Sequence, residues 1–340
     1  MSPNATQCRP IGGLAWLPIG LSLIGGASAH QHNSGPLASP TEVYDYSKST
    51  AENYAQPNAR LRREFFSTRA GLDYTYHTRY SLERQALQDE IIRSMLSYED
   101  MQRGLPSRRS ELDRMARGGG AASRLRQPER PWAIFTAGCM GAGKTHVMCA
   151  LDRHGLLPLP HFVRVDVDRI RELLPETQEY IRRDAKSAGH LTQQEAGLIA
   201  EVVSEEALSR GLNIWVDSSL RDADWWSTEL QRVRRSYPHK LAILRVDASW
   251  DRVQDRADRR AEITGRRIPL QVLKATFKRV PAAITQLREL VDEFIDINNN
   301  GEHPKLKASR DTRALIRVCR DVGGDCESRH LESWLPGLVD

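Results

Sequence analysis

The sequence predicts an α/β fold, in which a parallel sheet carries helices on both faces and a helical extension precedes it. An apolar run over residues 132–137 leads into a glycine-rich loop, and a helical pattern follows that loop. Short apolar strands then alternate with helical patterns as far as residue 297, which is typical of a parallel sheet. Before the loop, residues 61–115 carry the period of amphipathic helices.

The loop over residues 138–145 fits the phosphate-binding pattern G-x-x-x-x-G-K-[ST]. Its glycines allow the backbone to wrap a phosphate with the N–H groups turned inward, and the next helix adds its positive N-terminus. The lysine then reaches the β- and γ-phosphates of ATP, and the threonine hydroxyl suits Mg²⁺. A plain glycine turn is the alternative, but the position between a strand and a helix favours a nucleotide site. The residues expected to bind ATP and Mg²⁺ are Gly138, Gly141, Gly143, Lys144 and Thr145.

The chain before the loop is expected to contain no catalytic residues. Residues 31–60 are rich in Ser, Pro, Asn and Gln and predict a linker, and residues 117–131 predict a flexible joint. Residues 31–125 are therefore interpreted as a linker and a helical extension that packs on the main domain. The extension has an apolar stripe formed by Leu82, Leu87, Ile91, Met95 and Leu96.

The main domain is expected over residues 126–300, with a C-terminal tail over 301–340. One helix should run from residue 192 to about residue 210, opened by a capping box between Thr192 and Glu195. A short helix over residues 169–174 should end at a proline. Further strands are predicted over residues 161–168, 212–217, 241–246 and 294–297.

Composition limits the partners. The net charge of +5 and isoelectric point near 9 tolerate an anionic substrate but fall short of the charge expected of a nucleic-acid binder. We therefore expect no nucleic-acid partner. The five cysteines show no C-x-x-C spacing, and Cys139 lies in the glycine-rich loop. Reduced thiols are expected, with no disulfide framework and no zinc site.

The first thirty residues contain an apolar run over residues 11–24, and residues 27–29 resemble a signal-peptidase site. The run is short and glycine-rich for a membrane span, so no span is expected. Its only basic residue is Arg9, and an ATP-using enzyme suits the interior of the cell. We expect a cytoplasmic or organellar protein, with a cleaved secretory leader over residues 1–30 as the alternative.

Carboxylates follow the predicted strands at the edge where parallel sheets bind ligands. Asp168 is positioned to accept a proton from a hydroxyl that attacks a γ-phosphate, although a helix cap is the alternative. For Asp166 a role in catalysis or ligand binding and a role as helix cap are equally open. Asp217 ends an apolar strand, and either a Mg²⁺ or substrate-hydroxyl ligand or a turn residue fits it.

An arginine-rich stretch over residues 252–267 is the last candidate. Arg252, Arg256 and Arg260 are four residues apart and would share one helix face. A solvated surface helix is the ordinary interpretation, since Asp255 and Arg259 have the spacing of an ion pair. The break after residue 263 instead indicates a helix and loop that form a lid over the phosphates.

With these elements in order, the sequence resembles the zeta toxin family of P-loop kinases. The resemblance covers most of residues 130–300 and is carried by the stretches 138–145, 165–176, 192–201, 211–221 and 260–269. Bacterial members of that family use ATP and Mg²⁺ to phosphorylate the amino sugar of UDP-N-acetylglucosamine. The resemblance therefore implies a P-loop kinase fold and an alcohol group as the acceptor.

The resemblance also implies roles for individual residues. It implies that Asp168 is the base, and that Arg260 and Arg266 contact the transferring phosphate, with Arg259 as a substitute for Arg260. It implies contacts to the substrate for Glu201, Asp217 and Ser219. Asp217 and Ser219 are smaller than the Glu and Thr of the bacterial proteins, which predicts a different pocket. Glu195 is left as a capping residue, since its spacing from Thr192 explains it.

The leading hypothesis is an ATP-dependent kinase that acts on a small molecule, phosphorylated or nucleotide-linked, such as a nucleotide sugar. A polynucleotide 5′-hydroxyl kinase is one alternative, but it needs stacking aromatics, and Trp225 and Trp226 form the only adjacent aromatic pair after the loop. A nucleotide-dependent switch or binding module is another. The base and the arginines favour an enzyme, because a switch needs no base.

Overall fold

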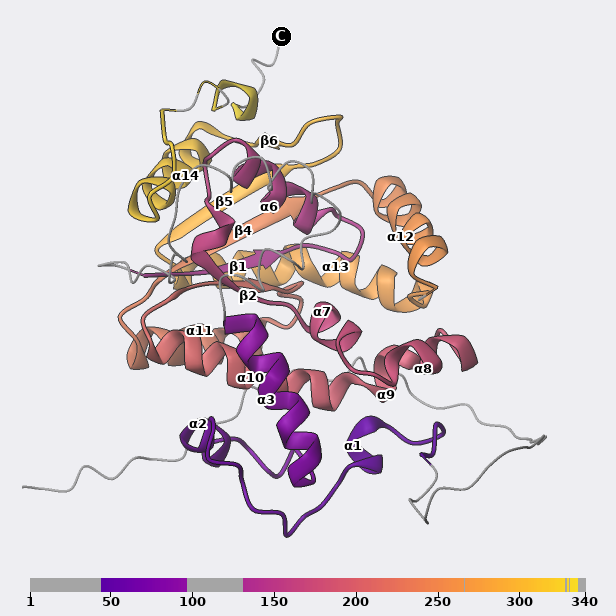
Figure 1. Ribbon diagram of the computed structural model, residues 1–340. Coiled ribbons are helices and arrows are strands. Elements are labelled where there is room, and N and C mark those ends of the chain that lie inside the picture. The colour runs from indigo at the N-terminus through magenta and orange to yellow at the C-terminus, as the bar shows by residue number, and fades with distance from the viewer. Residues whose placement is uncertain (1–43, 97–130, 266, 328, 330, 336–340) are drawn as a thin grey trace, which may run out of the picture.

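The computed structural model describes residues 44–96, 131–265, 267–327, 329 and 331–335 (Figure 1). The expected leader, most of the expected joint and Arg266 lie outside these residues. Twelve α-helices and six strands are described below by the labels of Figure 1.

A six-stranded sheet in the order β2-β3-β1-β4-β5-β6 forms the centre of the described chain. All neighbouring strands are parallel except β5 and β6, which pair antiparallel. The predicted fold class is therefore confirmed. The strands are β1 Trp132–Ala137, β2 Phe162–Val165, β3 Asn213–Asp217, β4 Lys240–Asp247, β5 Glu293–Asn298 and β6 Lys305–Leu306.

Helices cover both faces of the sheet, with α6 and α14 above it and α10 and α11 below it in Figure 1. The helix after the glycine-rich loop starts at Lys144, and Gly155 has a φ of +74° just beyond its end. The helices of this part are α6 Lys144–Arg153, α7 Val167–Glu172, α8 Thr177–Arg183, α9 Ala188–Leu191, α10 Gln193–Ser209, α11 Ala223–Ser236, α12 Trp250–Thr264, α13 Leu270–Leu287 and α14 Ser309–Asp321.

Two apolar cores separate at the sheet because successive strand residues face opposite sides. Ala133 and Phe135 of β1 join one core with α10, α11 and the second half of α13. Trp132 and Ile134 join the other core with α6 and α14. The strands are buried on both faces, which explains why they read as continuous apolar runs. This scaffold fixes the carboxyl ends of β1, β2 and β3, where the loop and the carboxylates lie.

Two local predictions are wrong. The predicted strand over residues 161–168 ends at Val165, because Asp166 caps α7 by accepting hydrogen bonds from the backbone N–H groups of residues 168 and 169. The capping box between Thr192 and Glu195 does not form. The Thr192 hydroxyl donates to the carbonyl of Ala188, and the Glu195 side chain is fully buried against another part of the chain.

That other part is the N-terminal segment, defined here as residues 44–96, which lies against α10 (Figure 1). It contains α1 Thr50–Asn53, α2 Phe66–Ala70 and α3 Leu82–Leu96, with extended chain and turns between them. The continuous helical pattern predicted from residue 61 is therefore broken before α3. Residues 44–60, predicted as linker, are also ordered against the domain, since Thr50 and Ala51 are buried. Residues 97–115 lie outside the described residues.

Buried charges join the N-terminal segment to the main domain. The guanidinium of Arg84 forms two hydrogen bonds with the carboxylate of Glu176, both 2.9 Å long, and two with that of Glu195, 2.6 and 2.9 Å long. It also lies 4.0 Å above the ring of Tyr54. Burial alone would raise the pKa of Glu176, but the hydrogen bonds from Arg84 outweigh it and lower that pKa. The pairing was missed because these residues are about a hundred positions apart in sequence.

Replacing Arg84 by Met is expected to lower the free energy of unfolding by about 3–5 kcal/mol, since two buried carboxylates lose their cation. The matched control is Arg93→Met on the same helix. Arg93 pairs with Glu64 at 3.1 Å, but these side chains are 57% and 39% exposed. The control should cost less than about 1 kcal/mol. Urea denaturation of both variants checks this, and equal losses would contradict it.

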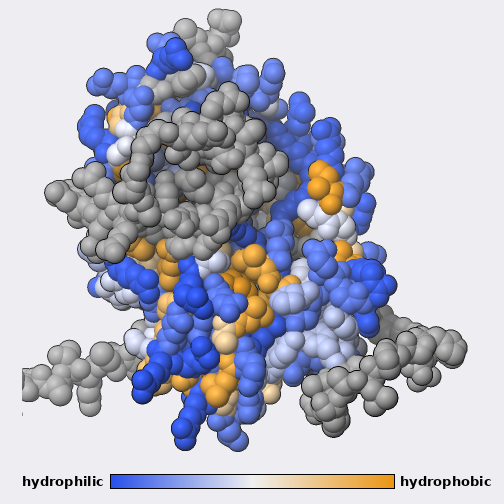
Figure 2. Space-filling view, viewed as in Figure 1, coloured by the Kyte–Doolittle hydropathy of each residue, from blue (hydrophilic) through white to orange (hydrophobic). Residues whose placement is uncertain are grey.

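Hydrophilic side chains cover most of the face shown in Figure 2. Among the described residues, each helix is too short or too polar to cross a lipid bilayer.

Candidate active site

The glycine-rich loop has a backbone that only glycine adopts readily. Gly138, Gly141 and Gly143 have φ angles of +150°, +89° and +90°. A side chain is also excluded, since a Cβ atom at Gly138 would lie 2.5 Å from the carbonyl oxygen of Val246. At Gly141 it would overlap the carbonyl oxygen of Val253. The loop is thus folded tightly against the ends of β4 and α12.

Asn299, to which sequence analysis gave no role, and Arg256 hold the loop from outside. The Asn299 side chain donates a 2.7 Å hydrogen bond to the carbonyl of Ala142, and Arg256 donates a 3.1 Å bond to the same oxygen. Arg256 also donates to the Asn299 carbonyl at 3.0 Å. Burial lowers the pKa of Arg256. Arg256 was expected on the ligand side of a lid, and instead it supports the loop backbone.

Lys144 and Thr145 meet Asp217 at the carboxyl end of β3. The Lys144 ammonium lies 3.9 Å from one carboxylate oxygen of Asp217, and the Thr145 hydroxyl donates to the other at 3.3 Å. The Thr136 hydroxyl also donates to Asp217, at 3.1 Å, because the two residues are paired in the sheet register. An ammonium, a hydroxyl and a carboxylate therefore converge at the start of α6.

Arg164 of β2 is a site residue that had no role in the predictions. Its guanidinium lies 2.6 Å from the carboxylate of Asp166 and 3.7 Å from that of Asp217, and it stacks 4.5 Å above the ring of Trp215. Burial raises the pKa of Asp166, although the guanidinium of Arg164 acts against it. The signal was present in the sequence, because Arg164 alternates with three valines and so shares a strand face with Asp166.

Asp168 lies in the first turn of α7, and each of its carboxylate oxygens has a guanidinium partner. Arg171 binds Oδ1, and Arg260 of α12 lies 3.0 Å from Oδ2. Arg171 is itself buried and fixed at the start of α10, donating to Thr192 Oγ1 at 2.8 Å and to Gln193 Oε1 at 2.7 Å. Arg171, fixed at α10, thus holds one carboxylate oxygen of Asp168, and the other oxygen lies beside Arg260 of α12.

Of the two arginines left open by the sequence, the structure brings Arg260 to the carboxylates. Burial would lower its pKa, but Asp168, Asp166 and Asp217 outweigh this effect and raise it, so Arg260 stays charged. Arg259 pairs instead with Asp255 at 3.0 Å on the exposed side of α12, the surface pair that the spacing predicted. Arg266 lies outside the described residues.

The remaining substrate candidates have other neighbours. Ser219 accepts a 3.3 Å hydrogen bond from the N–H of Gly138 through its carbonyl, which places it beside the loop. Glu201 is fully buried on α10, and its carboxylate lies 2.8 Å from Nε2 of His77 in the N-terminal segment. The partner described for Glu201 therefore lies in the N-terminal segment, whereas that of Ser219 lies in the phosphate loop. The substrate role implied for Glu201 therefore stays a prediction.

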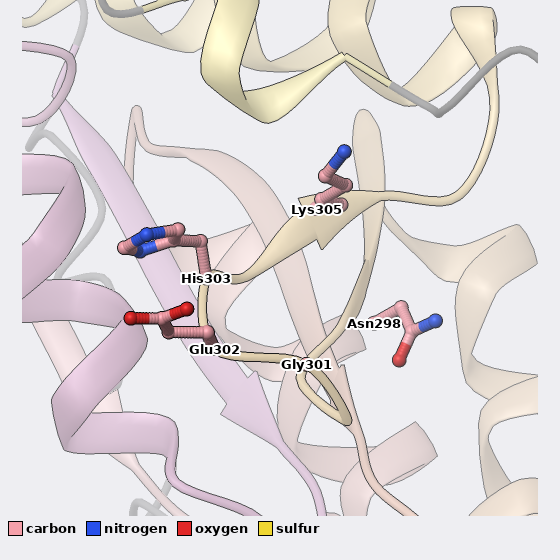
Figure 3. Close-up of a pocket in the computed structure, with 5 residues that line it drawn as sticks. All are labelled: Asn298, Gly301, Glu302, His303 and Lys305. Carbon is pink, nitrogen blue, oxygen red and sulfur yellow. The ribbon is translucent and has the colours of Figure 1, made fainter.

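A depression of about 300 Å³ lies on the turn between β5 and β6, lined by Asn298, Gly301, Glu302, His303 and Lys305 (Figure 3). The side chains of Glu302 and His303 extend to the same side of the turn. Asn299, next to this turn, bonds the phosphate loop. The depression thus includes Asn298, the sequence neighbour of a residue that bonds the loop.

A parallel sheet whose central strand ends in a phosphate loop, with carboxylates and an arginine facing its end, defines a P-loop nucleotide-binding protein of the kinase type. The sequence model of the family described as Zeta toxin matches residues 119–310, more than half of the chain. The chain belongs to the zeta toxin family, as the sequence predicted. Family membership supports nucleotide-dependent kinase activity.

Solved structures are similar at low sequence identity. One describes the PezAT chromosomal toxin–antitoxin system of Streptococcus pneumoniae, with a TM-score of 0.45 and 15% identity over 62% of this chain and 92% of that chain. The AvrRxo1-ORF1:AvrRxo1-ORF2 complex with sulphate ions has a TM-score of 0.49 and 15% identity, covering 86% of this chain and 83% of that one. The same pair with ATP has a TM-score of 0.47 and 14% identity, covering 76% and 75%. No curated protein matches the sequence. The family assignment rests on the family match alone.

Proposed function

We propose that this protein transfers the γ-phosphate of ATP to a hydroxyl group of a small molecule that is phosphorylated or nucleotide-linked. Nucleotide sugars such as UDP-N-acetylglucosamine are the first class to test. The observation that most supports the proposal is the 3.0 Å pair between Asp168 and Arg260. Phosphate transfer needs a group that accepts the hydroxyl proton and a cation that neutralises the phosphate, and these are two such groups.

The loop and Lys144 bind the triphosphate in this proposal. The N–H groups of a loop that leads into a helix attract phosphate oxygens, and the ammonium reaches the outer phosphates. The depression beside Asn299 is our candidate for the nucleotide base. The buried Arg164 lies 3.5 Å from the Thr145 hydroxyl and keeps two carboxylates neutralised near the triphosphate.

The oxygens of Thr145 and Asp217 fit Mg²⁺. They lie 3.3 Å apart, and both are hard oxygen ligands. Among the described residues, no group of three or more His, Cys, Asp or Glu side chains is arranged to hold a metal. A site with one carboxylate and one hydroxyl is typical of Mg²⁺ that takes its other ligands from phosphates and water. When bound, the ion neutralises phosphate charge.

Replacing Asp217 by Asn is therefore expected to weaken binding of Mn²⁺, used as a probe for Mg²⁺, by about 10–100-fold in the presence of ATP. The carboxylate charge is lost while its size is kept. Electron paramagnetic resonance titration measures the free Mn²⁺. Asp224→Asn, an exposed change on α11, should leave the affinity unchanged. Equal affinities for both variants would remove Asp217 from the metal site.

Asp168 accepts the proton of the attacking hydroxyl, and Arg260 stabilises the transferring phosphate. Arg260 can bind the phosphate once its pair with Asp168 separates, and the carboxylate of Asp168 is a stronger base without that neighbouring cation. The γ-phosphate carries more negative charge than one carboxylate and competes for Arg260. Arg171 stays on Oδ1 and keeps the carboxylate oriented.

Replacing Arg260 by Ala is expected to lower the rate of transfer by about 10²-fold or more, as loss of a donor to developing charge does. Arg259→Ala is the matched control, one residue away and paired only with the surface carboxylate Asp255 in the bonds described above. Its rate should stay within about twofold of the unmodified chain, because a surface pair contributes little. Steady-state kinetics at saturating ATP compares the two. A larger loss for Arg259→Ala would reverse their assignment.

The proposal is tested by incubating the protein with γ-labelled ATP and a panel of nucleotide sugars, with water and a 5′-hydroxyl oligonucleotide as comparisons. Label in a nucleotide sugar is the expected result. ATP binding with no transfer to any acceptor would favour a nucleotide-dependent switch. Label on the oligonucleotide would favour the polynucleotide kinase, for which the tryptophan pair is poorly suited, since Trp226 is buried against Phe135.

A further inference from the structure

Two cysteines at the C-terminal end of α14 have adjacent sulfur atoms. Cys319 is fully buried in the last part of the helix, and Cys326 is half-buried in the turn that follows. The Cys319 thiol donates to the sulfur of Cys326 over 2.7 Å, and Cys326 in turn donates to the carbonyl of Gly324 at 3.5 Å. This contact lies outside the site described above and has no role in the proposed phosphate transfer.

The turn between Cys319 and Cys326 folds back on the end of α14. Gly323 has a φ of +76°, and the N–H of Gly324 donates a 2.8 Å hydrogen bond to the carbonyl of Cys319. A Cβ atom at Gly324 would lie 2.9 Å from the sulfur of Cys319 and 2.6 Å from the carbonyl oxygen of Leu156. Only a glycine leaves room there for the two sulfurs to approach.

The same turn attaches the end of the described chain to α6, the helix that begins at the phosphate loop. The N–H of Asp325 donates to the carbonyl of Gly155 at 2.8 Å. Further on, the buried Trp334 donates from its ring N–H to Nδ1 of His154 at 2.7 Å. A constraint between Cys319 and Cys326 would therefore hold the turn over residues 323–326, which Asp325 bonds to the end of α6.

We propose that Cys319 and Cys326 are a reversible oxidation site, at which a disulfide forms and fixes the turn over residues 323–326 beside the end of α6. A metal is a poorer occupant, since no group of three or more suitable ligands is found in the described part of the chain. The other two cysteines there differ in their surroundings. Cys139 is buried and donates to the carbonyl of Leu273, and Cys149 lies on α6.

The oxidant is a small-molecule disulfide such as glutathione disulfide. Burial and the neighbouring Cys326 raise the pKa of Cys319, so Cys326, the more exposed thiol, reacts first. Its thiolate attacks one glutathione sulfur, which gives a mixed disulfide and releases one glutathione thiolate. Cys319 then attacks the sulfur of Cys326, its proton passes to the second departing glutathione, and the protein disulfide remains. Two protein thiols are oxidised and one glutathione disulfide is reduced to two thiols.

Peptide mapping of the full chain tests the proposal. The protein is incubated over a range of glutathione redox ratios, quenched in acid, alkylated and digested with trypsin. Cleavage after Arg317, Arg320 and Arg329 separates the two cysteines, so the disulfide joins peptides 318–320 and 321–329. The expected result is that joined pair, in a fraction that rises with glutathione disulfide. Alkylation of both cysteines at every ratio, or a stable mixed disulfide on Cys326, would overturn the proposal.

Two variants test whether oxidation is specific to the pair Cys319 and Cys326 or affects any cysteine of the chain. Cys149→Ser should leave the joined peptides unchanged, whereas Cys326→Ser should abolish them and leave Cys319 alkylated. Oxidation of the unmodified chain should raise its thermal midpoint by about 3–8 °C, because the closed loop limits the unfolded state. Cys326→Ser should show no such difference between redox ratios. Formation of the disulfide without any rise in the midpoint would overturn its role in fixing the turn over residues 323–326.

Discussion

Replacing Asp168 by Asn is expected to lower the rate of phosphate transfer by about 10²–10⁴-fold, the usual contribution of a general base. Asparagine keeps the size and the hydrogen-bonding ability of the side chain toward Arg171, but it cannot accept the proton of the attacking hydroxyl. ATP binding should change little, because the hydrogen bonds described here join Asp168 to Thr145 indirectly, through Asp166 and Arg164. Single-turnover kinetics measures the rate, and calorimetry measures ATP affinity.

The control for this variant is Glu172→Gln, an exposed carboxylate on the same helix, which should leave both quantities unchanged. Transfer that continues at the unmodified rate in the Asp168→Asn protein would exclude Asp168 as the base. Loss of ATP binding together with transfer would instead assign Asp168 to the nucleotide site.

Replacing Lys144 by Met is expected to lower transfer by about 10²–10³-fold and also to weaken ATP binding. Methionine keeps much of the length of the chain and removes the charge that reaches the outer phosphates. The fold should survive, because Asp217 retains the hydroxyls of Thr136 and Thr145 and the guanidinium of Arg164 at 3.7 Å. Calorimetric titration with ATP and the transfer assay measure the two effects.

Lys278→Met, an exposed change on α13, is the matched control and should alter neither ATP affinity nor transfer. Unfolding curves of both variants should coincide with that of the unmodified chain. If Lys144→Met binds ATP with unchanged affinity, the ammonium does not contact the triphosphate in the bound state.

The elements that sequence analysis predicted correctly are those set by local chemistry. The phosphate loop needs glycine at positive φ, and the strands need runs of apolar residues, so both can be read from neighbouring positions. The pairing of Arg259 with Asp255 also follows from spacing along one helix, whereas the position of Arg260 was implied by the family resemblance. The roles of the individual site residues in catalysis stay predictions.

The features that were missed depend on contacts between distant parts of the chain. Glu195 has the spacing of a capping residue, but Arg84 competes for its carboxylate from the N-terminal segment and gains two hydrogen bonds there. Asn299 has no local pattern that indicates its bond to the phosphate loop. Arg164 was visible on a polar strand face, but only the sheet register brings it to Asp217.

Two buried carboxylates on α10 bear on where a folding P-loop domain can begin. Thirteen of the 17 residues of this helix are buried, and the carboxylates of Glu195 and Glu201 have partners in Arg84 and His77. A gene fragment that encoded the P-loop domain without residues 44–96 would leave these two carboxylates without their partners, among uncovered apolar side chains. The shortest fragment that keeps the partners of both carboxylates therefore includes residues far upstream of the phosphate loop.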